Sequence, residues 1–205
     1  MLDIGLVGPL IAVLAAGDVI MHMCLDWKKT RRDHVALREP IASVRVLPMT
    51  GAIISTLLSF ALVSGLILMW VGILGIDTIS VLIPLFDPPP AIWVSGLMLL
   101  VVGIPIHGWS RWVRKNMASS WEMSEEHVLI TSGPYRWIRH PSYASYAICF
   151  VGLFLLVPSV ATTILLFGIP AYYSIAKREE ELLLEQFGEE YREYMKKTGR
   201  MAPRI

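Results

Sequence analysis

The sequence predicts an all-α integral membrane protein with five transmembrane helices. Of its 205 residues, 55% are hydrophobic, and the mean hydropathy is +0.57. The apolar residues fall in long runs, which are typical of membrane spans. Only 17% of the residues are charged, which leaves no room for a large soluble domain, and a net charge of +1 argues against nucleic acid as a partner. We therefore treat residues 1–205 as a single membrane domain.

Three spans are expected in the first half of the chain. The apolar runs 2–25, 47–76 and 91–109 are long enough to cross a hydrocarbon core of ~30 Å at ~1.5 Å per residue. The first run contains Asp18 and His22, four positions apart. Ionisable residues inside a span are functional candidates, but this pair can also satisfy each other or pack against a neighbouring helix.

The fourth and fifth spans are predicted to form a helical hairpin. Residues 143–157 and 159–176 are both apolar and are divided only by Pro158. Each is short for a complete span, so we expect a tight hairpin. The domain is thus expected to consist of three spans (1–109), a cytoplasmic loop that binds a cofactor (110–142), the hairpin (143–176) and a cytoplasmic tail helix (177–205).

The basic residues predict the orientation of the chain. With five spans, all 18 lysines and arginines lie on one side of the membrane, in residues 27–45, in the loop before the hairpin and in the tail. By the positive-inside rule that side is cytoplasmic, so the N-terminus is expected outside and the C-terminus inside. Trp109 and Trp112 are expected at the inner interface.

Polar and turn-forming residues are concentrated between residues 127 and 143, just before the hairpin. Gly133 and Pro134 indicate a turn. Pro141 favours an extended His140 and can itself be the first residue of the next helix. A backbone held this firmly beside imidazole, guanidinium and phenol groups suits the binding of a polar ligand.

The tail has the pattern of an amphipathic helix. An apolar stripe of helical periodicity runs through it, made of Leu183, Leu184, Phe187, Tyr191, Tyr194 and Met195. Glu180 falls at the centre of this stripe, whereas Glu179 and Glu181 fall on its flanks and are expected to be solvated. Gly199 and Pro203 are typical of a helix end.

A carboxylate on a buried face requires a partner. Arg136, Arg139 and His140 are the candidates. Glu180 is therefore expected either to form a structural ion pair or to face the cation or hydroxyl of a ligand.

The last eighty or so residues resemble the isoprenylcysteine carboxyl methyltransferases and, more distantly, the phospholipid N-methyltransferases. The residues that carry the resemblance are His127 with Leu129, Gly133-Pro134-Tyr135-Arg136, Arg139-His140-Pro141 with Tyr143, Glu179-Glu180 with Leu183, Phe187-Gly188, Tyr191, Tyr194, and Arg200 with Pro203.

This resemblance implies an enzyme that uses S-adenosylmethionine as methyl donor, needs no metal, and takes a lipophilic acceptor from the bilayer. By the same resemblance, Arg139 and Glu180 are the expected catalytic residues. The cofactor pocket would be lined by His127, Val128, Leu129, Gly133, Pro134, Tyr135, Arg139, His140, Pro141, Tyr143, Glu179 and Glu180.

The methyl acceptor is left open by the residues. A carboxylate is already nucleophilic at neutral pH and needs only a cation to hold it, for which Arg139, Arg178 and Arg200 are candidates. An amine needs a base such as His140 or Glu180. The pattern Phe-Gly-x-x-Tyr-x-x-Tyr together with Arg-x-x-Pro resembles the carboxyl branch of the family more closely, and this resemblance favours a prenylcysteine-like carboxylate over a phospholipid or other lipid amine. A non-catalytic transporter or scaffold, in which Asp18 and His22 serve an ion path, is the alternative from another class.

Overall fold

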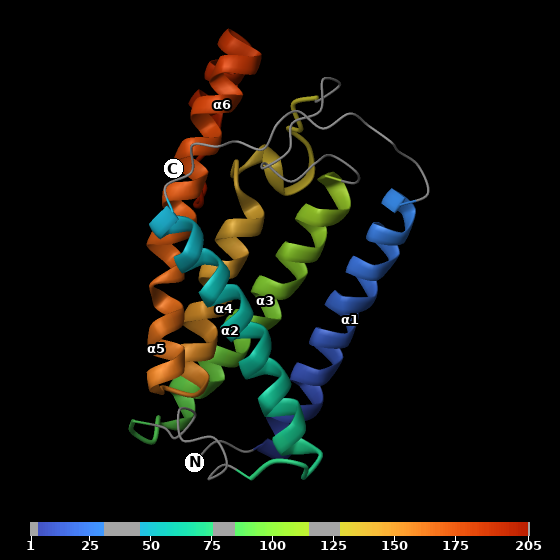
Figure 1. Cartoon of the computed structure of the whole chain (residues 1–205), viewed down its shortest axis with the longest axis vertical. Coiled ribbons are helices and arrows are strands. Elements are labelled where there is room, and N and C mark those ends of the chain that lie inside the picture. Colours follow the sequence, from blue (N-terminus) through green and yellow to red (C-terminus); the bar gives the residue numbers. More distant parts are fainter. Residues whose placement is uncertain (1–3, 31–45, 76–84, 115–127, 205) are drawn as a thin grey trace.

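The computed structural model describes residues 4–30, 46–75, 85–114 and 128–204, and their regular structure is helical apart from one isolated backbone bridge (Figure 1). The elements in chain order are α1 (Ile4–Thr30), α2 (Val46–Trp70), α3 (Pro90–Arg114), the short 3₁₀ helix η3 (Gly133–Arg136), α4 (Pro141–Leu156), α5 (Val160–Leu166) and α6 (Gly168–Lys197). The predicted all-α class is confirmed.

Helices α1 to α4 run in alternating directions, and α5 and α6 both run opposite to α4 (Figure 1). The ends of α1 and α3, the starts of α2 and α4, and η3 lie at one end of the bundle, and the turn between α4 and α5 lies at the other. Large apolar side chains such as Leu57 and Phe60 on α2 and Val102 on α3 are exposed, as expected of helices that face lipid.

Within the described residues, three helical segments are long and apolar enough to cross a membrane, namely Val46–Trp70, Pro90–Arg114 and Val160–Lys197. The apolar helical segments Gly5–Met21 and Pro141–Leu156 are shorter. The chain is therefore an integral membrane protein, while the number of five spans and their orientation remain predictions.

Glycines bring the backbones of α3 and α4 close together. A Cβ atom on Gly96 would lie 2.6 Å from the carbonyl oxygen of Gly152, and one on Gly152 would lie 2.9 Å from that of Gly96. The two backbones are thus in direct contact, and Leu97, Leu100 and Phe150 pack beside them in the buried core. This contact places the end of α3 next to the start of α4, where the site lies.

The predicted hairpin is present, with its turn at Pro158. Ser159 caps α5 through a reciprocal pair of bonds, because its hydroxyl accepts from the Thr162 amide at 3.3 Å and its own amide donates to the Thr162 hydroxyl at 2.9 Å. The chain re-enters a helix at Gly168, where a Cβ would lie 2.6 Å from Ser55 on α2.

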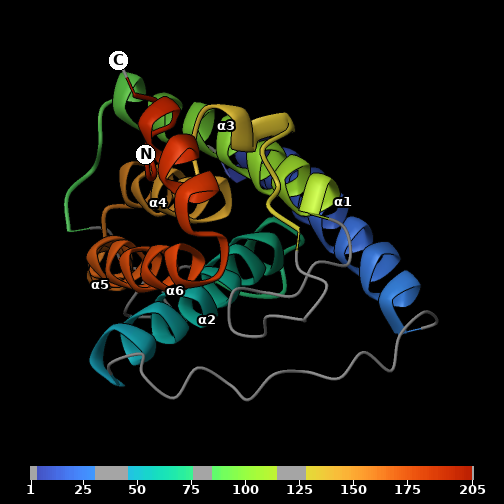
Figure 2. The ribbon, with the colours of Figure 1, turned by 90° about the horizontal axis from the view of Figure 1, so that it is seen from above.

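The separation of a fifth span (159–176) from a tail helix is wrong. One helix, α6, continues from Gly168 to Lys197, because the charges that begin at Lys177 end the apolar run without ending the helix. The interruption lies instead at Gly188, whose backbone is non-helical with φ +54° and ψ −119°. The helix changes direction there (Figure 2).

The predicted apolar stripe is therefore not continuous. Tyr191 and Tyr194, which follow Gly188, are buried, whereas Leu183, Leu184 and Phe187 before it are only partly buried. A wheel drawn through the whole tail cannot represent two helical segments that point in different directions.

We expect Gly96→Ala to lower the thermal midpoint of the detergent-purified protein, corresponding to a loss of roughly 1–3 kcal/mol, because its methyl group would push α3 and α4 apart. Gly17→Ala is the matched control, since a Cβ at Gly17 meets nothing within 4 Å. Equal midpoints for the two variants would contradict the backbone contact between α3 and α4.

Candidate functional site

Glu180 lies between two arginines at the end of the bundle that carries η3. Its Oε1 accepts a hydrogen bond from Nε of Arg139 at 2.7 Å, and its Oε2 accepts from Nε and Nη2 of Arg200 at 2.9 and 2.6 Å. The Glu180 side chain is only 3% exposed and that of Arg139 8%. The predicted proximity of the Arg-His-Pro turn to Glu180 is therefore present, in the form of an ion pair.

The chain after α6 is tied to the turn by its backbone as well. The amides of Arg139 and His140 donate to the carbonyls of Gly199 and Arg200, each at 2.9 Å, and the amide of Gly199 donates to Trp137 at 3.1 Å. The Arg139 guanidinium also donates to the carbonyl of Thr198. The segment 198–200 thus lies along residues 137–140 as a short parallel bridge.

The expectation that Glu179 is solvated is wrong, because this side chain is buried, with a relative exposure of 5%. Its Oε1 accepts from the Tyr143 hydroxyl at 2.5 Å, and its Oε2 lies 3.3 Å from Nδ1 of His140. The helical wheel assumes that only one face of the tail helix is covered by the rest of the protein. Residues from α4 cover one side of α6, and residues after its end cover another, so two consecutive carboxylates are both enclosed. Glu181 is exposed, as expected.

His140 lies between the two buried carboxylates. Its Nε2 is 3.5 Å from Oε1 of Glu180, and its ring is stacked on Tyr143 with 2° between the planes. Burial lowers the pKa of this imidazole, but hydrogen bonding to Glu179 and Glu180 and their negative charges outweigh burial, so the pKa of His140 is raised above 6.5. When it is protonated, the ring compensates part of the charge of the glutamate pair.

The turn at Gly133 is fixed by its surroundings. Gly133 has φ +59°, and a Cβ there would lie 2.6 Å from the Val113 side chain on α3. The following 3₁₀ turn buries Pro134, and the carbonyl of Tyr135 accepts a bond from the Tyr194 hydroxyl at 2.5 Å. The glycine is required here by both its backbone conformation and the contact with α3.

The predicted residues divide into three groups. His140 and Tyr143, at the start of the α4 that begins with Pro141, meet Glu179 and Glu180 directly. Gly133 and Pro134 share a 3₁₀ turn with Tyr135, whose carbonyl accepts the bond from Tyr194, whereas Val128 is 60% exposed and Leu129 is half-buried. His127, with the side chain of His22, lies outside the described residues.

Two further residues of this region were not identified as site candidates from the sequence. Tyr191 is 1% exposed, and its hydroxyl, near Glu180 and Arg139, has no hydrogen-bond partner among the residues described here. Arg114 ends α3, and its buried Nε likewise lacks a partner among them. The periodicity identified Tyr191 only as a member of an apolar stripe. An orphaned hydroxyl beside two carboxylates, as at Tyr191, is suited to a small polar ligand.

Residues 91–190 match the family model described as phospholipid methyltransferase. Among curated proteins, the chain is similar to protein-S-isoprenylcysteine O-methyltransferases. It is 36% identical to the human protein over 86 residues, which cover 41% of this chain and 30% of that one. It is 39% identical to the Tribolium castaneum protein over 95 residues, covering 41% and 31%, and 34% identical to the Schizosaccharomyces pombe protein over 85 residues, covering 40% and 36%.

These matches span about a third of the length of the curated relatives. A solved structure of a eukaryotic intramembrane Ras methyltransferase, isoprenylcysteine carboxyl methyltransferase, aligns with 80% of this chain and 55% of its own, at 20% identity and a TM-score of 0.47. The sequence similarity to the isoprenylcysteine O-methyltransferases agrees with the resemblance that rests on the Arg-His-Pro turn and the glutamate pair.

We expect Glu180→Gln to destabilise the fold by roughly 3 kcal/mol or more, because two largely buried guanidinium groups lose their shared counter-ion. Glu181→Gln is the matched control, since Glu181 pairs with Arg178 on the exposed face and such pairs contribute ~1 kcal/mol or less. Thermal unfolding of the two purified variants measures the difference. Similar midpoints would show that the buried ion pair contributes little to the fold.

The raised pKa of His140 predicts a pH-dependent stability. A histidine whose folded-state pKa lies above its unfolded value stabilises the fold fully below pH ~6.5, and this contribution is lost as the pH rises through the folded-state pKa. The thermal midpoint should therefore fall as the pH is raised from 6.5. His140→Gln should reduce that slope, and an unchanged slope would contradict a charged His140.

Proposed function

We propose, from the match of residues 91–190 to the phospholipid methyltransferase family model and from their similarity to the isoprenylcysteine O-methyltransferases, that this chain is an S-adenosylmethionine-dependent membrane methyltransferase. The proposed acceptor is a membrane-embedded lipophilic molecule, with a prenylcysteine-like carboxylate as the first candidate and a lipid amine as the alternative. One observation carries the proposal: the Arg-His-Pro turn and the glutamate pair form one buried polar cluster at the end of an apolar bundle, although Arg139 and Glu180 are 41 residues apart in the sequence.

The donor is proposed to bind beside this cluster, in contact with Gly133, Pro134, Tyr135, His140 and Tyr143. When bound, it would supply a methyl group attached to a sulfonium sulfur. The donor also carries an ammonium group. Carboxylates and aromatic faces are the groups that recognise such cations. The site contains both, since Glu179 lies against Tyr143, and the Tyr143 ring lies 5.0 Å from that of Tyr172.

The contacts of the two predicted catalytic residues favour a positioning role over direct contact with the reacting atoms. Both oxygens of Glu180 accept hydrogen bonds from guanidinium groups, and the Arg139 side chain is held by Glu180 and by Thr198. We propose that Arg139 and Glu180 are positioning residues, which hold His140 and Glu179 in place. Glu179, His140 and the hydroxyl of Tyr191 are proposed as the groups that face the donor.

The reaction itself would need positioning more than chemical assistance. When bound beside Glu179, His140 and Tyr191, the donor would supply its methyl group to a carboxylate oxygen of the acceptor, which would give a methyl ester and leave a neutral thioether. Holding acceptor and donor in line can supply most of the acceleration, because effective molarities of aligned groups reach ~10⁵ M or more. Buried side chains around the cluster would exclude water from the two reacting charges.

A cation for the acceptor carboxylate is available at Arg114. Arg139 and Arg200 are engaged with Glu180, and Arg178 pairs with Glu181 on the exposed side of α6. Arg114 ends α3, which packs on η3, and its Nε has no partner among the described residues. This supports the carboxylate as acceptor.

The proposed orientation follows from the basic residues. The described arginines Arg111, Arg114, Arg136, Arg139 and Arg200 belong to the end of the bundle that carries η3 (Figure 1). By the positive-inside rule we propose that this end faces the cytoplasm and that the chain crosses the membrane five times, with its N-terminus outside.

The decisive experiment supplies the purified protein with methyl-labelled S-adenosylmethionine and, in parallel, a farnesylcysteine analogue or phosphatidylethanolamine. We expect label on the farnesylcysteine analogue, released by mild base because the product is an ester. Base-stable label on phosphatidylethanolamine would favour the lipid amine, and label on neither acceptor would contradict the proposed substrates.

Donor binding is tested separately by calorimetry with S-adenosylhomocysteine. Glu179→Gln should weaken binding by ~10-fold or more, because it removes the carboxylate next to Tyr143 and His140. Glu181→Gln, one position along on the exposed face, should leave binding within about twofold. An unaltered affinity in Glu179→Gln would overturn the assignment of the donor site, and no binding by the unmodified protein would favour a non-catalytic role.

A further inference from the structure

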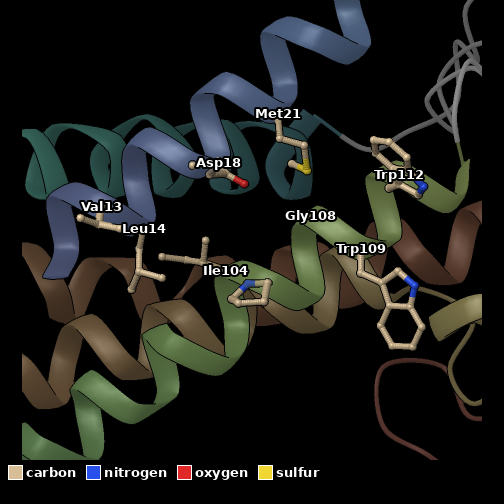
Figure 3. Close-up of a pocket in the computed structure, with 10 residues that line it drawn as sticks. Val13, Leu14, Asp18, Met21, Ile104, Gly108, Trp109 and Trp112 are labelled. Carbon is tan, nitrogen blue, oxygen red and sulfur yellow. The ribbon is translucent and has the colours of Figure 1, made fainter.

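Two buried hydroxyl groups join α3 to the start of α4, outside the cluster of the glutamate pair. Ser110 on α3 is 0% exposed, and Ser142, the second residue of α4, is 9% exposed. The opposite face of α3 lines a pocket toward α1, to which Ile104, Gly108 and Trp112 contribute (Figure 3). At ~100° per residue, Ser110 lies on the other side of the helix from these three residues. Ser110 therefore belongs to the contact with α4 and not to that pocket.

The hydrogen bonds of Ser110 have a fixed direction. Its hydroxyl donates to the carbonyl oxygen of His107 at 2.8 Å and lies 2.6 Å from the hydroxyl oxygen of Ser142. A hydroxyl group has one hydrogen to donate, whereas a carbonyl oxygen can only accept. Because the hydrogen of Ser110 goes to His107, Ser142 must be the donor in the bond between the two serines.

The phenol of Tyr135 continues this row of hydroxyl groups. Tyr135 is part of η3, and its side chain is hydrogen-bonded to that of Ser142. Burial raises the pKa of Tyr135 above its usual value of 10, so the phenol keeps its hydrogen at neutral pH. Since the hydrogen of Ser142 is already donated to Ser110, the phenol must donate to Ser142. Donation thus runs in one direction, from Tyr135 through the two serines to the carbonyl of His107.

This direction determines what Tyr135 can offer to a ligand. With its one hydrogen directed at Ser142, the phenol oxygen can only accept a hydrogen bond from any further partner. The phenol is within electrostatic reach of Glu179 and Arg114, so it belongs to the site that is proposed for the methyl donor. A ligand N–H or O–H group is the complementary partner for an oxygen that can only accept.

We propose that Ser110 and Ser142 are positioning residues for the methyl donor, because they hold the hydrogen of the Tyr135 phenol away from it. The phenol oxygen then accepts a hydrogen bond from an N–H or O–H group of the bound donor. The inference rests on the proposed function, since it requires a methyl donor beside η3. It gives a role in ligand recognition to two serines that act through Tyr135.

The test compares Ser110→Ala with Ser95→Ala in calorimetric titrations of the purified protein with S-adenosylhomocysteine. Without Ser110, the hydroxyl of Ser142 can turn and donate to Tyr135, which occupies the phenol oxygen and directs its hydrogen toward the ligand. We expect Ser110→Ala to weaken binding ~5-fold. Ser95 is the matched control, because it lies on the same helix and donates only within it, to the carbonyl of Ala91 at 2.7 Å.

Ser95→Ala should leave the affinity within about twofold of that of the unmodified protein. Equal affinities of Ser110→Ala and Ser95→Ala would overturn the proposal. Ser142→Ala is a second variant of the same row, and it should also weaken binding ~5-fold, because the phenol hydrogen loses its acceptor.

A double-mutant cycle separates positioning from a purely structural loss. In Tyr135→Phe there is no phenol for Ser110 to orient, so the addition of Ser110→Ala should change the affinity by less than about twofold. A structural role alone would leave the effect of Ser110→Ala at ~5-fold in the Tyr135→Phe background, and that result would overturn the proposal.

Thermal midpoints without ligand distinguish a failure of this inference from a failure of the proposed function. The midpoint shifts of Ser110→Ala and Tyr135→Phe should combine to less than their sum, because both variants interrupt one row of hydrogen bonds. Additive shifts would contradict the row itself. No binding of S-adenosylhomocysteine by the unmodified protein would contradict the proposed function and this inference together, whereas binding with additive effects on affinity would contradict this inference alone.

Discussion

One buried carboxylate holds the functional end of this protein together. Glu180 accepts hydrogen bonds from Arg139, before α4, and from Arg200, after α6, with oxygen–nitrogen distances of 2.6 to 2.9 Å. A buried charge is tolerated only when it is neutralised and hydrogen-bonded. Because Glu180 requires both arginines, the chain before α4 and the chain after α6 must meet on the same face of α6.

The geometry of the remaining cluster follows from that constraint. With Arg139 fixed, His140 can only lie between Glu179 and Glu180, and Pro141 starts α4 immediately afterwards. The first turn of α4 then presents Tyr143 to Glu179. A charged, hydrogen-bonded arrangement of this kind is directional, so it defines side-chain positions more sharply than apolar packing does. This is the kind of rigidity that a site requires if it works by aligning two reactants.

Much of the fold could be predicted because its signals are local. Pro158 and Pro141 mark a turn and a helix start wherever they occur, and long apolar runs identify spans irrespective of their neighbours. The contact between Arg139 and Glu180 could be predicted for a different reason, namely that a carboxylate in an apolar stripe requires a cation as partner. The burial of Glu179 could not be predicted from the sequence, because it depends on two separate segments that cover α6 from different sides. Tyr191 was likewise identified only as apolar, since periodicity does not show that a hydroxyl is left without a partner.

The change of direction at Gly188 explains how one helix can serve both the membrane and the site. Before this residue α6 packs against α2 and the hairpin, and after it the helix carries Tyr191 and Tyr194 into the polar cluster. A Cβ on Gly188 would meet nothing within 4 Å, so lack of space does not explain the glycine. The reason is the backbone, since φ +54° with ψ −119° lies in a region that is accessible to glycine and costly for other residues. A straight helix would carry Tyr194 away from the Tyr135 carbonyl, and Arg200 could not then return to Glu180. From the sequence, Gly188 is recognisable only as part of a motif. The bend in α6 gives a structural reason for a glycine at this position.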